Sequence, residues 1–511
     1  MTENYLSILA ETIRNNWDQP ALTDFYLTED GSAQDTSRGN HYTYGEMYAE
    51  ICRVAEMLTS LGLQKGDYIA ICGANSAHWC IAYLAIAKMQ GVSVTVMHTL
   101  MPDQIASLVD FSDAKALFTD VDLWSELKNQ SPPQVQSVIS LEDWNLLRGK
   151  KNTNYQLQIT NGEIGFSPVE PDSLAMICFT SGTTGNPKGV MLSYGCVSVN
   201  ALYLSQLYKS IPKKNTISFI PFSHMGGFIL ELIQPLCDGE NVNITQQPIS
   251  LKELNRCYTI LSPTIVMMVP GVLYKMLELY PKEQINSLLG SNLYLLGIGG
   301  AKLSHDIENR MISEGIPLAI GYGTTECGPF ISIAMPHDFK SGAAGRLILS
   351  ISCKISPAGE ILVKGENVML GYYKDPEATA AKIDSDGWLH TGDKGHLDED
   401  GYLYVEGRLE QDIIVLPNGE NIRPDNIEAL INALPEVSES IVLARDGHLV
   451  AIVVPQITNH QSPITNTDLR RMIMRNVNPQ LPLFSQLYDV EISENPLQRT
   501  EKQTIKRYLY K

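Results

Sequence analysis

The sequence predicts an α/β fold with a large N-terminal domain of layered α/β subdomains plus a β-rich subdomain, followed by a small, mobile α+β C-terminal domain. Three observations favour this arrangement. Helical and strand periods of apolar residues alternate over the N-terminal part. Short strands separated by Gly and Asp follow beyond about residue 340, and a compact helix-strand-strand-helix pattern ends the chain.

The N-terminal alternation begins with a helix and a strand. Residues 44–62 carry apolar side chains at helical spacing, and residues 67–72 form a short apolar strand. The same pair recurs in residues 76–91 and 92–97. Strands and helices in this order predict a parallel sheet covered by helices.

Three later strands run directly into loops of small residues. Residues 174–179 precede the segment TSGTTGNPKG, and residues 294–300 and 317–323 both end in glycine. Ligands of open α/β sheets bind at the carboxyl ends of strands. Glycines let backbone N–H groups approach an anion and hydroxyls add donors, so the first loop is a phosphate-loop candidate. It is not a Walker loop, because Pro187 and Gly189 flank its lysine.

The C-terminal half gives shorter elements. The expected strands and helices are, in order, strands over 360–365 and 402–407, a helix over 426–434, strands over 439–444 and 449–454, and a helix over 467–477. At 511 residues the chain exceeds the size at which a single core stops growing. We therefore expect two domains, residues 1–410 and 411–511.

Charge and cysteine content exclude several classes of function. The chain has 38 basic and 57 acidic residues, a net charge of −19, which disfavours binding to nucleic acid or to an anionic membrane. Its nine cysteines contain no CxxC pair, which is typical of reduced core thiols. No signal peptide or transmembrane segment is evident. We expect a cytoplasmic protein that does not bind nucleic acid.

Five further segments place small residues beside one or two functional groups: PFSHMGG (221–227), GIGGAKL (297–303), GYGTTECGP (321–329), WLHTGDKG (388–395) and GRLEQD (407–412). In this order, with the phosphate loop before them and a lysine near the C-terminus, they resemble the acyl-adenylate-forming superfamily. This group includes acyl-CoA synthetases, adenylation domains and beetle-type luciferases. The resemblance extends from about Tyr44 to Lys502. The segments NVMLGYYKDPEAT and DGWLHTGDKG are most similar to fatty-acyl or aryl-acid CoA ligases.

The resemblance implies a reaction in two halves. A carboxylate first attacks the α-phosphate of ATP, which gives acyl-AMP and pyrophosphate, and a thiol such as that of coenzyme A then displaces AMP. Two anions meet in the first half, so the site needs fixed positive charge and Mg²⁺. The residues expected to hold the β- and γ-phosphates are Thr180, Ser181, Gly182, Thr183, Thr184, Gly185 and Lys188. Glu326 and the Thr180 hydroxyl are the expected Mg²⁺ ligands.

The resemblance also assigns nucleotide-binding residues. Gly300, Ala301 and Tyr322 would sandwich the adenine. Asp393 would accept both ribose hydroxyls through its two oxygens, and Arg408 would also reach the ribose. The remaining expected contacts lie in the GYGTTE motif: Gly323, Thr324 and Thr325.

His224 would lie beside the acyl carbonyl and the α-phosphate, where it would donate to the oxyanion or gate the pocket by rotating. Many amino-acid-activating relatives place an Asp at the next position, to pair with an α-ammonium group, and this chain has Met225. An unpaired buried ammonium is costly, so a plain carboxylic acid is favoured. The expected acyl-pocket residues are Met225, Phe228, Val269, Gly297, Gly299 and Gly300.

In the C-terminal region Lys502 would neutralise the attacking carboxylate and the α-phosphate, with Lys506 as the alternative. Gln411 would be the hinge about which the small domain rotates between the two half-reactions. Asn418, Gly419 and Glu420 would face the pantetheine arm of coenzyme A. The sequence departs from the family pattern at three positions: Tyr194, Glu410 and Glu501.

The sequence thus predicts an ATP-dependent carboxylic acid–CoA ligase. A fatty acid is the first choice of substrate, and an aryl or other small acid is the second. One alternative is an adenylating enzyme that loads the phosphopantetheine thiol of a carrier protein. The other is a catalytically impaired nucleotide-binding relative, which the three departures from the family pattern motivate.

Overall fold

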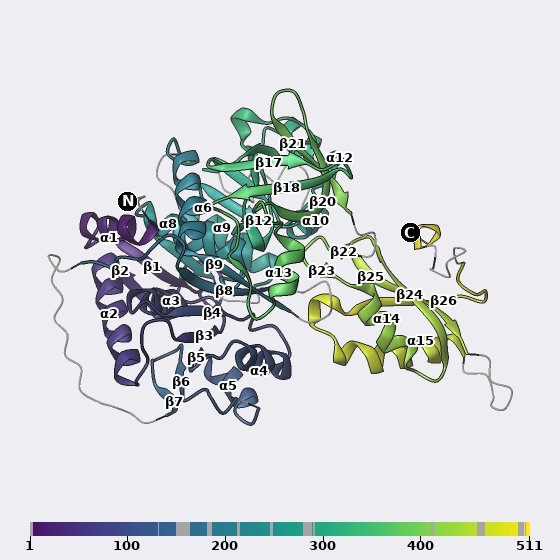
Figure 1. Ribbon diagram of the computed structural model, residues 1–511, viewed down its shortest axis with the longest axis horizontal. Coiled ribbons are helices and arrows are strands. Elements are labelled where there is room, and N and C mark those ends of the chain that lie inside the picture. The colour runs from purple at the N-terminus through teal and green to yellow at the C-terminus, as the bar shows by residue number, and fades with distance from the viewer. Residues whose placement is uncertain are drawn as a thin grey trace. The chain divides into compact units, whose positions relative to one another are not determined.

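The computed structural model describes residues 4–130, 132–149, 164–180, 187–211, 215–245, 249–279, 289, 292–409, 413–456, 465–498, 505 and 507–510. The chain forms two compact units (Figure 1). The larger unit spans Met1–Thr180, Lys188–Met268 and Val272–Leu409, and the smaller one consists mainly of Glu410–Lys511.

One sheet of the larger unit has a parallel centre, in the order β8-β4-β3-β5-β6. Antiparallel strands extend it at both edges, with β9 and β19 on one side and β7 on the other. The bounds are β3 (Tyr68–Cys72), β4 (Val92–Thr95), β5 (Ala116–Thr119), β6 (Ser137–Ser140), β7 (Leu146–Arg148), β8 (Leu174–Thr180), β9 (Lys188–Ser193) and β19 (Gly371–Tyr372). The predicted parallel α/β layer is confirmed, whereas β9 and β19 were not predicted.

The second sheet begins with a parallel half that runs from β1 through β11, β10, β12 and β13 to β14, with β2 antiparallel at its edge. The bounds are β1 (Pro20–Phe25), β2 (His41–Thr43), β10 (Thr216–Ser218), β11 (Val242–Thr245), β12 (Ile265–Met268), β13 (Leu295–Ile298) and β14 (Leu318–Tyr322). The predicted strands that end in glycine, β13 and β14, are neighbours, so their carboxyl ends lie at the same edge.

The predicted β-rich region continues this second sheet and is not separate from it. A 3₁₀ turn, η4 (Thr325–Cys327), reverses the chain after β14. The strands that follow in this second sheet pair antiparallel, in the order β15-β16-β21-β20-β18-β17. The bounds are β15 (Ser332–Ala334), β16 (Gly345–Leu347), β17 (Ile351–Ile355), β18 (Glu360–Gly365), β20 (Leu389–Leu397) and β21 (Tyr402–Arg408). Backbone hydrogen bonds therefore connect the two halves without a break.

Helices cover the two sheets. Their bounds are α1 (Tyr5–Asn15), α2 (Tyr44–Ser60), α3 (Ala77–Lys88), α4 (Pro102–Phe111), α5 (Val121–Leu127), α6 (Tyr194–Leu207), α7 (Met225–Phe228), α8 (Gln234–Cys237), α9 (Leu251–Leu261), α10 (Pro270–Leu279), α12 (His305–Ser313) and α13 (Pro376–Lys382). Thr43 and Glu46 form a capping box at the start of α2. Within the described residues, no helix is long and apolar enough to cross a membrane.

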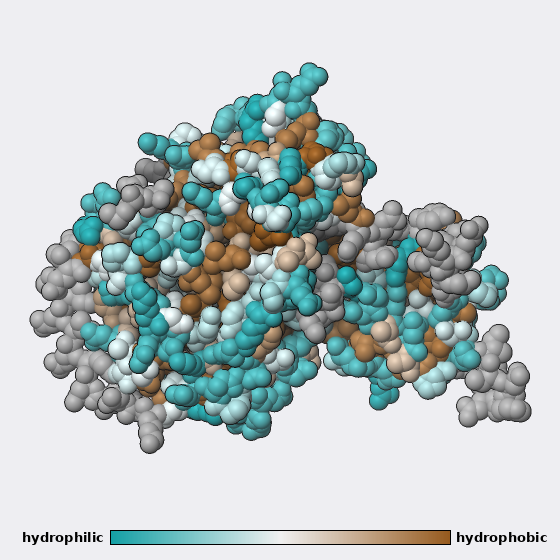
Figure 2. Space-filling view, viewed as in Figure 1, coloured by the Kyte–Doolittle hydropathy of each residue, from teal (hydrophilic) through white to brown (hydrophobic). Residues whose placement is uncertain are grey.

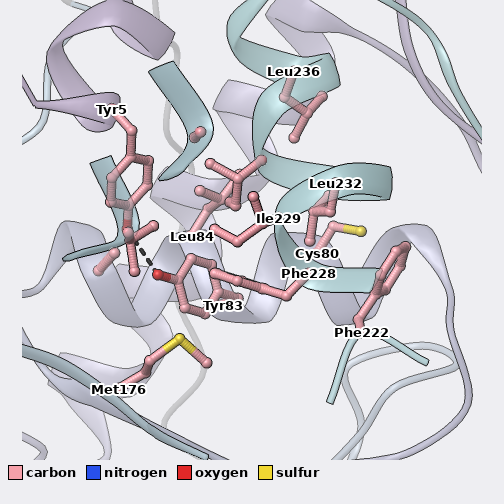
Figure 3. Packing of buried hydrophobic residues seen from close by; sticks show 14 of the residues in the cluster. Tyr5, Cys80, Tyr83, Leu84, Met176, Phe222, Phe228, Ile229, Leu232 and Leu236 are labelled. Carbon is pink, nitrogen blue, oxygen red and sulfur yellow. Dashed lines mark hydrogen bonds between the residues drawn. The ribbon is translucent and has the colours of Figure 1, made fainter. Parts of the chain in front are cut away.

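The core of the larger unit surrounds α3, which is buried from Ala77 to Ala87 and so lies in the interior. Figure 3 shows Tyr83 of this helix against Phe228 of α7, with the ring centroids 4.7 Å apart in an edge-on contact. The Tyr83 hydroxyl also lies 2.7 Å from the hydroxyl of Tyr5. The helix that follows His224 therefore rests on a closely packed aromatic core.

The smaller unit contains the predicted helix-strand-strand-helix pattern. Its elements are β22 (Ile414–Val415), β23 (Asn421–Ile422), α14 (Pro424–Asn432), β24 (Val437–Arg445), β25 (His448–Pro455), α15 (Asn466–Val477) and β26 (Leu487–Ile492). The strand β26, which was not predicted, pairs parallel with β25. Arg507 binds Glu428 through two hydrogen bonds of 2.7 Å, which fixes the end of the chain on α14.

The cysteines agree with the sequence prediction. All nine are free, and all except the partly exposed Cys353 are buried. The part of the chain that the structure describes has no cluster of His, Cys, Asp and Glu suited to holding a metal ion. The face drawn in Figure 2 has hydrophilic residues over α4 and α5, in keeping with the strong negative charge of the chain.

Candidate active site

The phosphate-loop candidate connects two paired strands. Thr180 ends β8, Lys188 begins β9, and the two residues lie opposite each other in the antiparallel register. The other predicted phosphate contacts lie outside the described residues: Ser181, Gly182, Thr183, Thr184 and Gly185. Their assignment stays a prediction.

Tyr372 links two of the predicted site residues. The short strand β19 pairs with β9, so that Tyr372 lies opposite Val190. Its hydroxyl donates to Glu326 Oε1 over 2.7 Å, and Lys188 Nζ lies 4.8 Å from the centroid of its ring. Tyr372 thus contacts Lys188 through the face of its ring and the Glu326 carboxylate through its hydroxyl. This contact of Tyr372 could not be predicted from the sequence, because it depends on the pairing of β19 with β9.

Glu326 is an ionised carboxylate. Burial alone would raise its pKa, but the positive charge of Lys382 and the hydrogen bond from Tyr372 outweigh that effect and lower the pKa below its ordinary value. Lys382 is held in turn by a bond from its Nζ to the backbone carbonyl of Thr391, 3.0 Å away. An ionised carboxylate is the kind of oxygen ligand that Mg²⁺ takes, together with the phosphates of a bound substrate.

The GYGTTE turn carries a buried hydroxyl. Thr324 Oγ1 has no hydrogen bond of ordinary geometry among the described residues, although its contact with Glu326 helps to lower the pKa of that carboxyl group. The backbone is tightly packed there, since a Cβ on Gly323 would lie 1.9 Å from the carbonyl oxygen of Pro329. A buried polar atom without a partner is costly unless a ligand or water satisfies it. This turn, which includes Thr325, therefore suits a polar ligand such as a nucleotide phosphate.

Tyr322 and Asp393, predicted at the nucleotide, lie in direct contact. The Tyr322 hydroxyl donates to Asp393 Oδ2 over 2.8 Å, and the backbone N–H of Asp393 donates to Thr391 Oγ1 over 3.0 Å. Burial and the Asp393 charge raise the pKa of Tyr322, so its phenol stays protonated. Arg408 lies opposite Asp393 in the backbone register, and its side chain is outside the described part of the structure.

Small residues follow β13, at the edge of the second sheet where β13 and β14 have their carboxyl ends. Gly300 has a φ of +80°, a conformation that glycine adopts at least cost, and Ala301 follows it. A Cβ on Gly299 would lie 3.4 Å from the carbonyl oxygen of Gly321, which is ordinary contact. At Gly297, by contrast, a Cβ would lie 2.2 Å from the sulfur of Met267, so that thioether packs directly on the glycine.

His224 caps the N-terminus of α7. Its Nδ1 accepts a hydrogen bond of 3.1 Å from the backbone N–H of Gly226, so the proton of the neutral imidazole is assigned to Nε2. The residue is solvent-accessible, yet the many protein atoms around its ring lower its pKa by desolvation. At neutral pH the side chain is therefore an uncharged Nε2–H donor.

Met225 and Phe228, which follow His224, are both buried, with 1% and 0% of their surface exposed. Val269 follows β12 directly. Their predicted place in an acyl pocket stays a prediction. In the smaller unit, Gly419 has a φ of +87° in the turn between β22 and β23. Gln411 and Lys502 lie outside the described residues.

Comparison with known proteins identifies the family. Residues 9–373 match the model of the AMP-binding enzyme family, and residues 411–510 match that of the AMP-binding enzyme C-terminal domain. The chain belongs to the AMP-binding enzyme family. The resemblance stated from the sequence motifs is thereby confirmed.

Relatives of this AMP-binding enzyme include CoA ligases. A 4-coumarate–CoA ligase of Vanilla planifolia is 26% identical over 467 residues, which cover 85% of this chain and 83% of that enzyme. A long-chain-fatty-acid–CoA ligase of Cavia porcellus is 28% identical over 485 residues, which cover 80% of this chain and 69% of that enzyme.

Two solved structures share the fold of this AMP-binding enzyme. The o-succinylbenzoate CoA synthetase of Bacillus subtilis matches with a TM-score of 0.77 and 24% identity, over 99% of this chain and 97% of that one. The amide bond synthetase McbA of Marinactinospora thermotolerans matches with a TM-score of 0.77 and 23% identity, over 99% of both chains.

Proposed function

We propose that this AMP-binding enzyme is an ATP-dependent carboxylic acid–CoA ligase that works through an acyl-AMP intermediate. The observation that carries the proposal is the cluster of Lys188, Tyr372 and the ionised Glu326 at the strand pair that bounds the phosphate loop. It supplies charges of both signs where a nucleotide triphosphate and its metal ion need them. The curated relatives at 26% and 28% identity are CoA ligases, which supports the second half of the reaction.

In the first half-reaction a carboxylate oxygen of the acid attacks the α-phosphorus, and the bond from that phosphorus to the leaving pyrophosphate breaks. Glu326 and the Thr180 hydroxyl would hold Mg²⁺, which when bound neutralises phosphate charge. Asp393 and Tyr322 would position the nucleoside, and the loop from Thr180 to Lys188 would hold the pyrophosphate.

His224 would act at the acid itself. Its Nε2–H is a neutral donor, and it would hold the carboxylate oxygen that does not attack, so that the other oxygen is directed at the α-phosphorus. The bond from Gly226 N–H to Nδ1 holds the ring in one orientation, which favours donation over a gating rotation. Lys502 would neutralise the two reacting anions in the same step.

In the second half-reaction the thiol of coenzyme A attacks the acyl carbonyl, the thiol proton is lost, and AMP leaves. Rotation of the small domain about Gln411, with Gly419 beside the pantetheine arm, is part of this proposal. A carrier-protein thiol is the alternative acceptor. The same fold occurs in an amide bond synthetase, so the fold alone does not fix the nucleophile.

We propose a carboxylic acid without an α-ammonium group as the substrate. A cationic amine beside the buried Met225 would lack a counter-ion, at a cost of roughly several kcal/mol. A fatty acid remains the first choice and an aryl acid the second, and the relatives include a ligase for each class.

The test is a panel of fatty, aryl and amino acids, each assayed for ATP–pyrophosphate exchange with Mg²⁺ and for AMP release with coenzyme A. We expect exchange with at least one non-amino acid, together with formation of its acyl-CoA. Glu326→Gln should abolish exchange. The matched variant Glu308→Gln should retain it, because Glu308 is also buried but binds the loop at Gly342.

Each unfavourable outcome has a definite meaning. Exchange without acyl-CoA, but with loading of a phosphopantetheinylated carrier protein, would replace coenzyme A by the carrier as acceptor. Absence of exchange with every acid would contradict the proposed activity and favour the catalytically impaired alternative.

A further inference from the structure

The loop that carries His224 is held by several hydrogen bonds to its backbone groups. It leaves the parallel sheet at the end of β10, runs through residues 219–223, and enters α7 at His224. The His224 N–H donates to the carbonyl of Pro221 over 2.9 Å, and the His224 carbonyl accepts from Phe228 N–H over 2.9 Å. The ring orientation described above therefore depends on where this loop lies.

Asn75 holds the loop from the other sheet of the larger unit. It follows β3, is 6% exposed, and points across to β10. Its Nδ2 donates to the carbonyl of Ile220 over 2.8 Å, while its Oδ1 accepts from Phe222 N–H over 2.8 Å. A second, longer contact of 3.4 Å joins Nδ2 to the hydroxyl of Ser218. The amide side chain thus supplies a donor and an acceptor to the same loop.

Two aromatic side chains hold the loop and the start of α7 against the core. Phe222 packs on Trp79 with the ring centroids 5.5 Å apart, and Phe228 packs on Tyr83 at 4.7 Å. Figure 3 shows Phe222 and Phe228 on opposite sides of this helix start, both directed into the core. A Cβ on Gly227 would lie 2.5 Å from the carbonyl oxygen of Pro221, so the helix and the loop are in close contact.

A third fixing point is Glu231, one turn further along in the π-helical segment η2 (Ile229–Ile233). Its Oε2 accepts hydrogen bonds from the N–H groups of Phe219 and Ile220, at 3.0 and 2.8 Å. Single π-turns inside helices occur frequently at functional sites. Here the π-turn continues the helix that begins at His224. It places the Glu231 carboxyl group against the loop that precedes this helix.

We infer that Asn75 is a positioning residue for His224, and that it affects adenylation only through the place and orientation of that imidazole. This inference rests on the proposed function, in which His224 donates to the reacting carboxyl group. Asn75 bonds the loop through its contacts with Ile220 and Phe222, and its longer contact is with the hydroxyl of Ser218 at the end of β10. Loss of the amide frees the segment before His224, and small displacements of a catalytic donor are costly in rate.

The test is a double-mutant cycle on ATP–pyrophosphate exchange, with Asn75→Ala, His224→Ala and the double variant. We expect Asn75→Ala to lower kcat by about tenfold or more while the KM for ATP changes by less than about twofold. In the His224→Ala background the same substitution should cost almost nothing further. An equal loss of kcat in both backgrounds, or no loss in either, would overturn the inference.

Asn243→Ala is the matched control. Asn243 is 4% exposed, and its amide donates to the carbonyl of Thr216 at the opposite end of β10. Both variants remove a buried amide, but only Asn75→Ala should lower kcat in a way that depends on His224. If Asn75→Ala does not fold, Asn75→Ser, which adds no charge and is too short to make both bonds, replaces the alanine in the same cycle.

A second measurement separates this inference from the proposed function. The NMR signals of the His224 imidazole, assigned with the His224→Ala variant, report its hydrogen bond and pKa without any turnover. We expect Asn75→Ala to shift these signals and their titration, and Asn243→Ala to leave both unchanged. Unshifted signals in Asn75→Ala would overturn the positioning role, whereas shifted signals in a protein without exchange activity would count against the proposed function alone.

Discussion

Replacement of Glu231 by glutamine should stabilise the larger unit, and the gain should grow with pH. Glu231 is fully buried, and burial raises its pKa to about 8 despite hydrogen bonds from the N–H groups of Ile220 and Phe219, which lower it. In the unfolded chain the ordinary value is 4.5. The folded protein therefore holds a proton that the unfolded chain has already released.

The direction of the pH dependence follows from this difference in pKa between the folded and the unfolded state. Below about pH 4.5 both states are protonated and the group has no effect. Between 4.5 and 8 the unfolded state binds fewer protons, so the free energy of unfolding falls as pH rises. At ~1.36 kcal/mol for each pH unit, the loss reaches about 3 kcal/mol at pH 7 and about 5 kcal/mol above pH 8.

A glutamine has no proton to lose over this range, and its carbonyl oxygen can still accept from the two N–H groups. The assay is urea unfolding at pH 5, 6, 7 and 8. It is followed by tryptophan fluorescence, because Trp17, Trp79, Trp124, Trp144 and Trp388 all lie in the larger unit. We expect the difference between Glu231→Gln and the wild type to increase in favour of the variant by about 1 kcal/mol per pH unit.

The neutral substitution Asn243→Ala is the control. It removes a buried hydrogen bond but no titrating group, so its difference from the wild type should not vary with pH. A constant offset for Glu231→Gln from pH 5 to 8 would refute the reasoning, and so would a gain that shrinks as pH rises.

The remaining predictions concern the reaction. Tyr372→Phe removes a hydrogen bond that helps to lower the pKa of Glu326, so the acid limb of the pH–rate profile for pyrophosphate exchange should move to higher pH. If the acid limb did not move, the Tyr372 hydroxyl would not contribute to the ionisation of Glu326. Lys502→Ala should abolish exchange and leave thioester formation from supplied acyl-AMP largely intact. An equal loss of both activities would refute its assignment to the first half-reaction, and retained exchange would redirect attention to Lys506.

Much of the fold could be predicted because its signals are local. The helix α2 has its capping box and its apolar stripe within one continuous segment, and β3, β4 and β8 are short apolar runs. The strands β9 and β19 were missed for a physical reason. KGVMLS has only partial apolar alternation, and two residues of β19 carry no period at all.

The residues of the candidate site also differ in whether their signals are local in the sequence. Glu326, Asp393 and His224 could be predicted as site residues because each lies in a short motif with a recognisable neighbourhood, and their roles stay predictions. Asn75 and Tyr372 were missed, because their partners are distant in sequence and only the packing of the two sheets brings them close. A motif reveals the groups that touch a ligand more readily than those that hold such groups in place.

The pairing of β19 with β9 also bears on how the chain can be divided. Val190 and Tyr372 are opposite each other in the register but belong to distant parts of the sequence. A chain shortened to residues 1–340 would keep the parallel half of both sheets, yet β9 would become an uncovered edge strand, open to pairing with another copy. Such a fragment should aggregate although its parallel strands are complete. Because contacts so distant in sequence form slowly, we expect the pairing of β19 with β9, and with it the contact of Tyr372 with Glu326, to form only after most of the chain has been synthesised.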